Sequence, residues 1–403
     1  MNRSKKVLGV FVAILAFVAF SMPAWASESL NNVVPWFKSM EIGLTGTGIV
    51  QGVSQKRAIN ATTLDSQKMN DKNYATYSID FEVNSYIGKT GHAYMLVEAG
   101  NGQGPDQYYY AFGPINNDAI GTDSEGRMSV SELWYQQAFF SDMCKIKVGK
   151  VDLTDNFDTN NVADDEETQF LAAEFVNNPT IDFPDYCFAV TLWAEPTKLV
   201  SVGLAYADAD ADWNSVLDRP FLMAEVDVHP TIANLEGNYR FMAWRNGAPH
   251  VNTAGTKNNA DFGFAISADQ KVLPELTLFA RWGWQDPDII NEDVDTGSMT
   301  ADTIGTVENA MSAGFQLNGA YWGRDKDHVA VAYGWDVLSG NYRDYLRNQG
   351  LSPRDEQHVE AYYHYQLNDH VNICPDVQFV MNPSGVKENH NMLVVGIRGQ
   401  VTF

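Results

Sequence analysis

The carboxyl-terminal segment 390–403 alternates regularly between apolar and polar positions. One face is apolar apart from Gly399 and carries Leu393, Val395, Ile397, Val401 and Phe403. The other face carries Gly396, Arg398, Gln400 and Thr402. Because a β-strand directs successive side chains to opposite faces, this segment predicts a strand between two different environments. A soluble sandwich and an outer-membrane barrel, with lipid outside and water inside, both fit the segment taken alone.

The same period of two recurs along the whole chain in segments bounded by turn residues. In segment 73–87, Tyr77 and Phe81 lie on one face and Ser78 and Asp80 on the other. The sixteen predicted strands are 38–51, 73–87, 91–100, 131–141, 143–151, 185–195, 198–208, 219–229, 234–245, 260–269, 275–285, 308–319, 327–338, 356–367, 371–381 and 390–403.

The connections between these strands alternate between short and long. Short turns such as 141–143 and 368–370 contrast with eight long connections. The long ones are 52–72, 101–130, 152–184, 207–218, 246–259, 286–307, 339–355 and 382–389. An even strand number with short periplasmic turns and long outer loops is typical of bacterial outer-membrane barrels. The pattern therefore predicts an all-β, transmembrane, antiparallel up-and-down barrel of 16 strands.

The amino-terminal segment is typical of a secretory signal peptide. Three basic residues precede the apolar run 7–20, and Ala24-Trp25-Ala26 supplies a small-x-small cleavage site. We expect cleavage after residue 26, which leaves a barrel domain of residues 27–403 in the outer membrane. No later stretch reaches the ~18 consecutive apolar residues of a membrane helix.

Charge and cysteine content narrow the classes of function. The formal charge of −24 becomes −27 when the three positive charges of the signal are removed, which argues against nucleic acid as a partner. An excess of carboxylates suits contact with cations. Cys144, Cys187 and Cys374 are an odd number, widely spaced, and fit neither a disulfide framework nor a zinc site.

The interior of the predicted barrel is expected to contain water. Barrels of eight strands are filled by side chains, whereas sixteen strands leave an aqueous channel. The third long connection, 152–184, contains two apolar pieces, 170–173 and 175–176. From Asp152 to Asp185 the chain has ten carboxylates and no Lys or Arg. Loops of this length are uncommon without a function, so we expect this one to have a functional role.

Several short motifs resemble one porin family. They are Glu-Leu-Trp-Tyr-Gln-Gln at 132–137, Val-Gly-Lys-Val-Asp at 148–152, Asp-Asn-Phe-Asp at 155–158, Gln-Phe-Leu at 169–171, Phe-Val-Asn-Asn-Pro at 175–179, Gly-Arg-Asp at 323–325, Glu-Ala-Tyr-Tyr at 360–363, Pro-Asp-Val-Gln-Phe at 375–379 and Asn-Pro at 382–383. With these motifs the mature chain resembles the OprB-type carbohydrate-selective porins. The resemblance implies a sixteen-stranded barrel that admits sugars by diffusion and is narrowed by an inward-folded loop, which is here the third outer loop, 152–184.

The candidate selectivity residues form an acidic and a basic set. The acidic set in the loop is Asp155, Asp158, Asp164, Asp165, Glu166 and Glu167. The basic set, which points inward by strand parity, is Lys145, Lys147, Arg240, Arg281 and Arg398. The resemblance implies basic residues near the constriction, and opposite an acidic loop they would create a transverse field that orients dipolar solutes. A solvated outer surface is the alternative interpretation of the acidic loop.

Two further sites are considered. The run 164–167 is a weak candidate for Ca²⁺, since clustered carboxylate oxygens suit that ion, and Asp208, Asp210 and Asp212 give a similar hint. No firm metal site or other cofactor is expected. Phe403 is an aromatic terminus on an alternating strand and resembles the signal that delivers such barrels to their assembly machinery.

Competing functions remain open from the sequence. A general cation-preferring diffusion channel without sugar selectivity is the main alternative, and a structural or adhesive barrel is another. An enzyme is not expected, because the chain has no compact Ser/His motif that would activate a nucleophile. Expected partners are small sugars or other hydrophilic solutes, outer-membrane lipid and the barrel-assembly machinery. Porins of this size are often homotrimers, but nothing in the sequence marks a subunit face.

Overall fold

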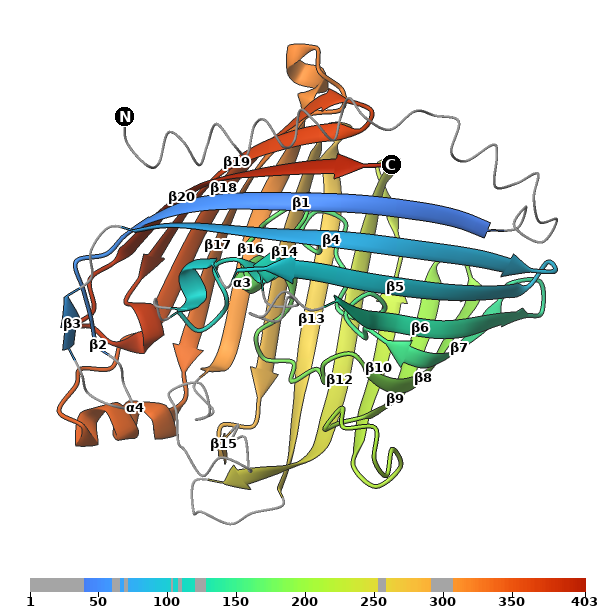
Figure 1. Ribbon diagram of the computed structural model, residues 1–403. Coiled ribbons are helices and arrows are strands. Elements are labelled where there is room, and N and C mark those ends of the chain that lie inside the picture. Colours follow the sequence, from blue (N-terminus) through green and yellow to red (C-terminus); the bar gives the residue numbers. More distant parts are fainter. Residues whose placement is uncertain are drawn as a thin grey trace.

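All sixteen predicted strands are present in the computed structural model and form one closed antiparallel barrel (Figure 1). The structure describes residues 40–59, 66–68, 72–102, 104–107, 111–119, 128–252, 259–290 and 307–403. The predicted signal, residues 1–26, lies outside the described residues.

The barrel strands follow one another around the ring in chain order. They are β1 (Met40–Ser54), β4 (Lys72–Ile87), β5 (Gly91–Asn101), β6 (Met128–Phe139), β7 (Cys144–Val151), β8 (Cys187–Thr197), β9 (Val200–Asp208), β10 (Pro220–Val228), β12 (Leu235–Asn252), β13 (Asn259–Leu273), β14 (Leu276–Gln285), β16 (Val307–Asn318), β17 (His328–Leu338), β18 (Glu356–Asn368), β19 (Val371–Met381) and β20 (Met392–Thr402). Short elements in the connections are β2 (Arg57–Ile59), β3 (Ser66–Lys68), β11 (Thr231–Ile232), β15 (Ile289–Ile290), α3 (Ala173–Val176) and α4 (Gly340–Asn348).

The first and last strands close the ring. β1 pairs with β4 on one side and with β20 on the other, both antiparallel, with Ile49 opposite Arg398 at the seam. Beyond the last residue of β20, Phe403 donates its backbone N–H to the Leu44 carbonyl at 2.9 Å. No strand edge of the ring is therefore left unpaired, which is what a barrel in lipid requires.

Two strands are longer than the alternation predicts. β12 ends at Asn252, whereas the predicted strand ends at 245. β13 runs from Asn259 to Leu273, whereas the predicted strand is 260–269. Their pairing shifts register between Asn246 and His250, and this irregular, polar stretch resembles a loop in sequence. The remaining strand ends agree with the predictions to within three residues.

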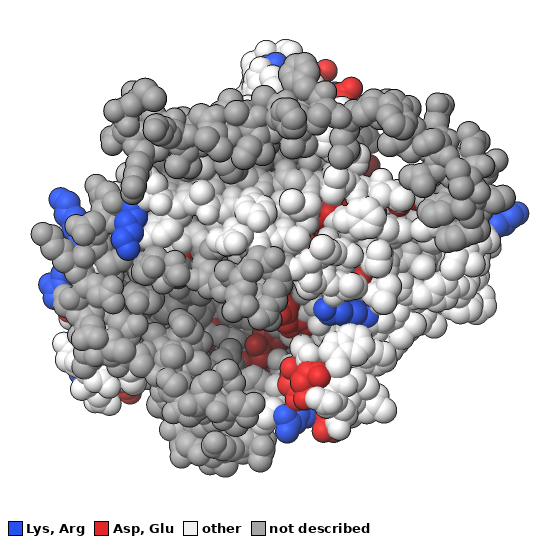
Figure 2. All heavy atoms as spheres, in the orientation of Figure 1, with Lys and Arg blue, Asp and Glu red and all other residues white. Residues whose placement is uncertain are grey.

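The outer surface is a band of apolar side chains. Ile79, Phe241 and Val395 are 43%, 49% and 52% exposed, whereas Ser78 and Asp80, on the opposite face, are buried. Of the residues expected to face outward at the carboxyl terminus, Leu393 and Ile397 of β20 and the terminal Phe403 are exposed, but Val401 is only 3% exposed. Figure 2 shows white outer surface nearly free of charge, with acidic atoms gathered in a hollow. This distribution fits lipid outside and water inside.

Other features of the described residues add detail to this architecture. No described helix combines the length and the apolar character needed to cross a membrane.

Cys144, Cys187 and Cys374 all carry free thiols, and the last two are buried. The three cysteines are thus small side chains of the strands β7, β8 and β19.

The 35-residue connection from β7 to β8, residues 152–186 and here called the inner loop, supplies an apolar core inside the barrel. Phe170 and Phe175 are fully buried and pack with Phe279 of β14 and Tyr362 of β18. Nearer its start, Phe157 packs against the wall in a second cluster that includes Phe221 and Trp244. Burying a phenylalanine contributes about 1.5–3 kcal/mol, so the two apolar pieces seen in the sequence are part of what holds the loop inside.

Candidate functional site

Wall side chains bind the backbone of the inner loop. Arg281 of β14 donates to the carbonyl oxygens of Phe175 and Asp158 at 2.7 and 2.8 Å. Arg398 of β20 donates to the carbonyl oxygens of Glu166 and, at 2.8 Å, Gln169. An irregular loop has no internal ladder of hydrogen bonds, so its buried carbonyls need donors of this kind.

Buried wall carboxylates complement these cations by accepting the loop's N–H groups. Glu360 of β18 accepts from Leu171 and Ala172 at 2.6 and 3.0 Å. Glu225 of β10 accepts from Asp158 at 3.0 Å. The loop begins and ends at β7 and β8, and β10 is only two strands from β8, but the anchors on β14, β18 and β20 lie far along the ring. The loop therefore crosses the interior of the barrel.

Two glycines of the wall make room for the loop. A Cβ on Gly283 of β14 would lie 2.0 Å from Thr180 Oγ1, and one on Gly334 of β17 would lie 2.2 Å from Glu174 Oε1. Both distances are far below contact distance, so any larger residue would push these side chains of the loop aside.

The second long connection also reaches the inner loop. Asn117 donates its backbone N–H to the Leu171 carbonyl at 2.9 Å, and Ala173 donates to the Pro114 carbonyl at 2.9 Å. Asp118 accepts a hydrogen bond from Ser78 Oγ of β4 at 2.8 Å. The sequence interpretation placed segment 101–130 among the outer loops and did not foresee this contact.

An acidic pocket of about 580 Å³ lies between the inner loop and strands β4, β5 and β6. Twelve of its described lining residues are carboxylates, and none of the described lining residues is Lys or Arg. These carboxylates are Asp80, Glu82, Glu98, Asp118, Glu132, Asp152, Asp155, Asp164, Asp165, Glu166, Glu167 and Asp185. Tyr94, Phe183 and Tyr186 add aromatic rings to the lining. Carboxylates and aromatic rings thus share one cavity.

The predicted acidic residues divide between this pocket and the loop anchors. Asp155 and the run 164–167 line the pocket, whereas Asp158 is fully buried in an ion pair with Arg281 (Oδ1 to Nε, 3.3 Å). Glu167 also accepts a hydrogen bond from Gln400 Nε2 at 2.8 Å. Asp165 caps the turn that follows it by accepting the backbone N–H of Glu167 at 2.8 Å.

Burial inside the barrel raises the pKa values of several carboxyl groups of the loop. Burial raises the pKa of Asp164 to about 8, against the opposing effect of Arg281, and burial raises that of Glu166 to about 8. Burial and the nearby Asp80 raise the pKa of Glu167 to about 10. The pKa of Asp155 is also raised by enclosure, although its side chain remains open to the pocket and Lys147 opposes the increase.

The predicted basic residues occupy three kinds of position. Arg281 and Arg398 point inward, but their guanidinium groups contact the loop and are buried rather than facing open water. Arg240 forms a buried ion pair with Asp269 at 2.8 Å. Lys147 lies 4.1 Å above the Trp134 ring, and Lys145 pairs with Glu195 at 3.1 Å, outside the pocket lining. This placement differs from the free basic wall that a transverse field requires.

The carboxylates of 164–167 do not converge as metal ligands do. In the part of the chain that the structure describes, Asp208, Asp210 and Asp212 form the one group of three or more whose ligand oxygens all lie within 4.8 Å of one another. The wall carboxylates Glu98 and Glu132 were missed as pocket residues. In the sequence, each of these two residues is recognisable only as a carboxylate on the inward face of a strand. Their place in the pocket depends on the folded ring, which brings these strands next to the loop.

A closed antiparallel barrel with a polar interior crossed by a loop defines the class of channel-forming porins. The model of the carbohydrate-selective porins, OprB family, matches residues 72–403, and the chain therefore belongs to this family. The family and the fold are those of bacterial outer-membrane channels rather than of enzymes.

Solved structures share this fold. The high-pH structure of Pseudomonas putida OprB is similar with a TM-score of 0.75 and 15% identity, over 94% of this chain and 96% of that chain. The outer-membrane channel DcaP of Acinetobacter baumannii is similar with a TM-score of 0.53 and 13% identity, over 90% and 97%. A mutant of Rh. blastica porin has a TM-score of 0.52 and 12% identity, over 90% and 100%.

One curated relative matches a shorter stretch. A protein of Aquifex aeolicus (strain VF5), described as uncharacterized, is 34% identical over 84 residues. The match covers 21% of this chain and spans only 27% of the relative's own length.

Proposed function

We propose that this chain is a porin through which small hydrophilic solutes, chiefly sugars, diffuse passively, and that the inner loop narrows the passage. The observation that carries this proposal is the pocket between the loop and β4–β6, where twelve carboxylates and three aromatic rings share one cavity. The family to which the chain belongs supports sugars as the solute class.

The chemistry of the pocket suits a sugar. Sugar hydroxyls donate hydrogen bonds, and carboxylates are strong acceptors with about four lone-pair sites each. The less polar face of a pyranose ring can lie against an aromatic side chain such as Tyr94 or Tyr186. A site that offers acceptors and a ring face in one water-filled cavity favours polyhydroxylated solutes over apolar ones of equal size.

Proteoliposome swelling tests the proposal. Swelling in isotonic glucose or maltose is expected to be faster than in an equally sized, less hydroxylated solute, because only the sugar gains both kinds of contact. The double variant Tyr94→Ala and Tyr186→Ala is expected to reduce this preference, and Tyr321→Ala, at an exposed position outside the pocket, serves as control. No swelling with any small sugar would contradict the porin function itself.

A general cation-preferring channel is the second candidate. The absence of Lys and Arg from the described pocket lining favours it, because twelve carboxylates raise the local concentration of cations. Reversal potentials in a KCl gradient, with and without added maltose, separate the two candidates. Strong cation preference that maltose leaves unchanged would favour this second function.

Neutralising Asp164, Asp165, Glu166 and Glu167 together tests the contribution of the loop to either function. We expect the quadruple Asn/Gln variant to have a reduced cation preference at about pH 9, where Asp164 and Glu166 are ionised. An unchanged reversal potential would place this part of the loop outside the narrowest passage.

We further propose that the protein is inserted in outer-membrane lipid by the barrel-assembly machinery, which recognises Phe403. The apolar outer band supports the lipid contact. A homotrimer is a prediction from chain size, and cross-linking in the native membrane tests it.

A further inference from the structure

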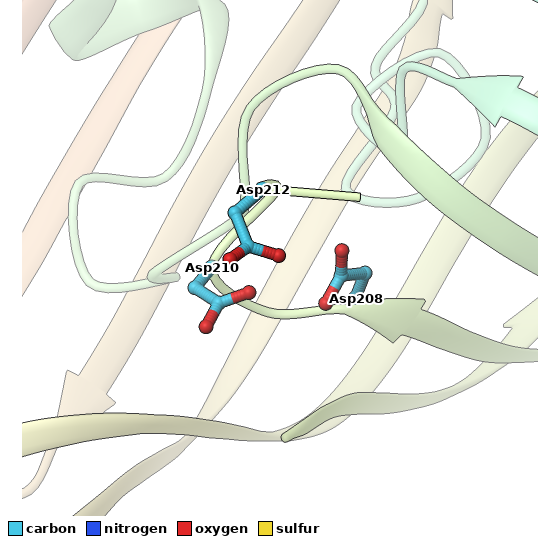
Figure 3. Close-up of side chains that lie close together, drawn as sticks. All are labelled: Asp208, Asp210 and Asp212. Carbon is cyan, nitrogen blue, oxygen red and sulfur yellow. The ribbon is translucent and has the colours of Figure 1, made fainter. Parts of the chain in front are cut away.

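Three carboxylates gather where β9 continues into its connection with β10. Asp208 is the last residue of β9, and Asp210 and Asp212 follow at alternate positions in the connection 209–219. One oxygen from each lies within 4.8 Å of the others. Figure 3 shows the three carboxylates turned toward a common space. The sequence marked this alternation of Asp and Ala only as a hint.

Two oxygens in this group are buried without a hydrogen-bond donor. The Asp208 side chain is fully buried, and its Oδ2 accepts the backbone N–H of Trp213 at 3.2 Å. Its Oδ1 is also buried but accepts no hydrogen bond from the described residues, and the same holds for Asp210 Oδ1. A buried carboxylate oxygen without a partner is costly, so this arrangement indicates a positively charged ligand.

The local charge suits a divalent ion. Arg219 Nη1 lies 2.9 Å from Asp210 Oδ2 and so neutralises one of the three negative charges while leaving Asp210 Oδ1 free. The remaining charge of the three carboxylates and Arg219 is about −2 when all the carboxyls are ionised. A monovalent cation would leave this cluster uncompensated, whereas a divalent cation balances it.

We propose that Asp208, Asp210 and Asp212 bind a divalent cation and that Ca²⁺ is the preferred ion. Calcium takes oxygen ligands at roughly 2.3–2.6 Å, so two ligands of one ion lie at most about 4.6–5.2 Å apart. The 4.8 Å limit on this group is within that span. Asp212 is exposed, so water can complete the six to eight ligands that Ca²⁺ requires.

The ion would hold the connection 209–219 against the barrel. At present the described contacts of this connection with the wall include Trp213 against Phe188, with ring centroids 6.1 Å apart, and Tyr206 Oη donating to the Val216 carbonyl at 3.2 Å. Trp213 and Leu217 are 48% and 75% exposed. Bound Ca²⁺ joins the buried end of β9 to the exposed part of this connection and so restricts its opening.

Terbium luminescence on the folded, detergent-solubilised chain tests the site. Tb³⁺ is expected to emit on excitation of tryptophan, because Trp213 follows Asp212 directly, and Ca²⁺ is expected to compete with it better than Mg²⁺. The double variant Asp208→Asn and Asp212→Asn is expected to bind Tb³⁺ at least about tenfold more weakly. Asp218→Asn removes one charge from the same connection outside the cluster and is the matched control. Slower migration after heating on a gel verifies that each variant is folded.

Limited proteolysis supplies a second measurement that does not depend on luminescence. Chymotrypsin cleavage after Trp213 or Leu217 is expected to slow several-fold when Ca²⁺ is added to the wild-type chain, and to be unaffected by Ca²⁺ in Asp212→Asn. Asp212→Asn alters an exposed side chain, so it serves if the buried change at Asp208 prevents folding. Equal Ca²⁺ affinity in wild type and in Asp212→Asn, with no protection from cleavage in the wild type, would overturn the proposal.

Discussion

Arg281 Nε lies 3.3 Å from Asp158 Oδ1, and both side chains are almost completely withdrawn from water. A cation of the barrel wall is thus paired with a carboxylate of the inner loop. The same guanidinium also donates to two loop carbonyls, which makes Arg281 the side chain with the most polar contacts to the loop among those described above.

Replacing Arg281 with Gln is expected to loosen the loop. The change leaves Asp158 buried without its charge partner, which typically costs about 3–5 kcal/mol. Single-channel recording should show a larger and noisier conductance. Lys145→Gln is the control, because its exposed pair with Glu195 contributes only about 0–1 kcal/mol. The double variant Arg281→Gln and Asp158→Asn should have a conductance and a current noise closer to those of the wild type than Arg281→Gln alone. Identical traces for Arg281→Gln and Lys145→Gln would count against the anchoring role.

Replacing Gly283 with Val is expected to displace the loop by steric overlap. Even the Cβ atom would lie 2.0 Å from Thr180 Oγ1 and 2.5 Å from Asn178 Oδ1. Because overpacking typically costs about 1–3 kcal/mol, we expect the barrel to fold while the loop shifts. Conductance should increase. Gly46→Ala is the control, since a Cβ there meets nothing within 4 Å. If Gly283→Val conducts like wild type, the loop does not limit the passage.

Cation preference is expected to rise with pH. The pKa values of Asp164 and Glu166 are raised to about 8 and that of Asp118 to about 6, so these carboxyls ionise between about pH 5 and 9. Reversal potentials in a KCl gradient should therefore shift toward cation selectivity from pH 5 to pH 9. The double variant Asp164→Asn and Glu166→Gln should flatten the upper part of this profile. Equal wild-type potentials at pH 5 and pH 9 would contradict the assignment.

The same pKa shifts predict a looser loop at high pH. An acid whose pKa is raised in the folded state binds its proton more tightly there than in the unfolded chain. Its stabilising contribution is therefore complete below the ordinary values of 3.8 for Asp164 and 4.5 for Glu166, and is lost as the pH rises through about 8. Protease cleavage within 152–186 should therefore become faster as the pH rises from about 4 to about 8, and should be faster at pH 9 than at pH 5. Faster cleavage at pH 5 than at pH 9 would reverse the expected sign.

Removing Phe403 is expected to affect assembly and not conduction. Its ring stacks on His370 with centroids 5.8 Å apart, and its side chain lies outside the pocket lining. The amount of folded protein in the outer membrane should fall, while the unit conductance of the surviving channels should remain unchanged. His370→Ala removes the stacking partner and separates loss of local packing from loss of recognition. An altered unit conductance would contradict the assembly role.

The alternation of apolar and polar residues within single strands was sufficient to predict the barrel, but it did not predict the contacts between the barrel wall and the inner loop. Leu393, Val395 and Ile397 face outward as expected, because the period of two is a local property. Parity also places Arg281 and Arg398 inward. Their partners were beyond prediction, since Arg398 meets the Glu166 carbonyl 232 residues away, and that proximity depends on how the loop crosses the closed barrel.

The acidic pocket was predicted in part for the same reason. The carboxylates of 164–167 stand out in the sequence as a run, whereas Glu98 and Glu132 are single inward residues on separate strands. Nothing local distinguishes them from other polar lining. Likewise, the contact of Asn117 with Leu171 joins two loops whose meeting depends on strand order around the ring.

The pairing of β1 with β20 has a consequence for biogenesis. The first strand gains its second neighbour only after the last strand has been delivered, so a chain cut short during synthesis keeps a row of unpaired backbone groups on β1. Arg398, which holds the inner loop, belongs to that same last strand. A truncated chain would therefore lack both the strand that closes the ring and one of the anchors of the inner loop.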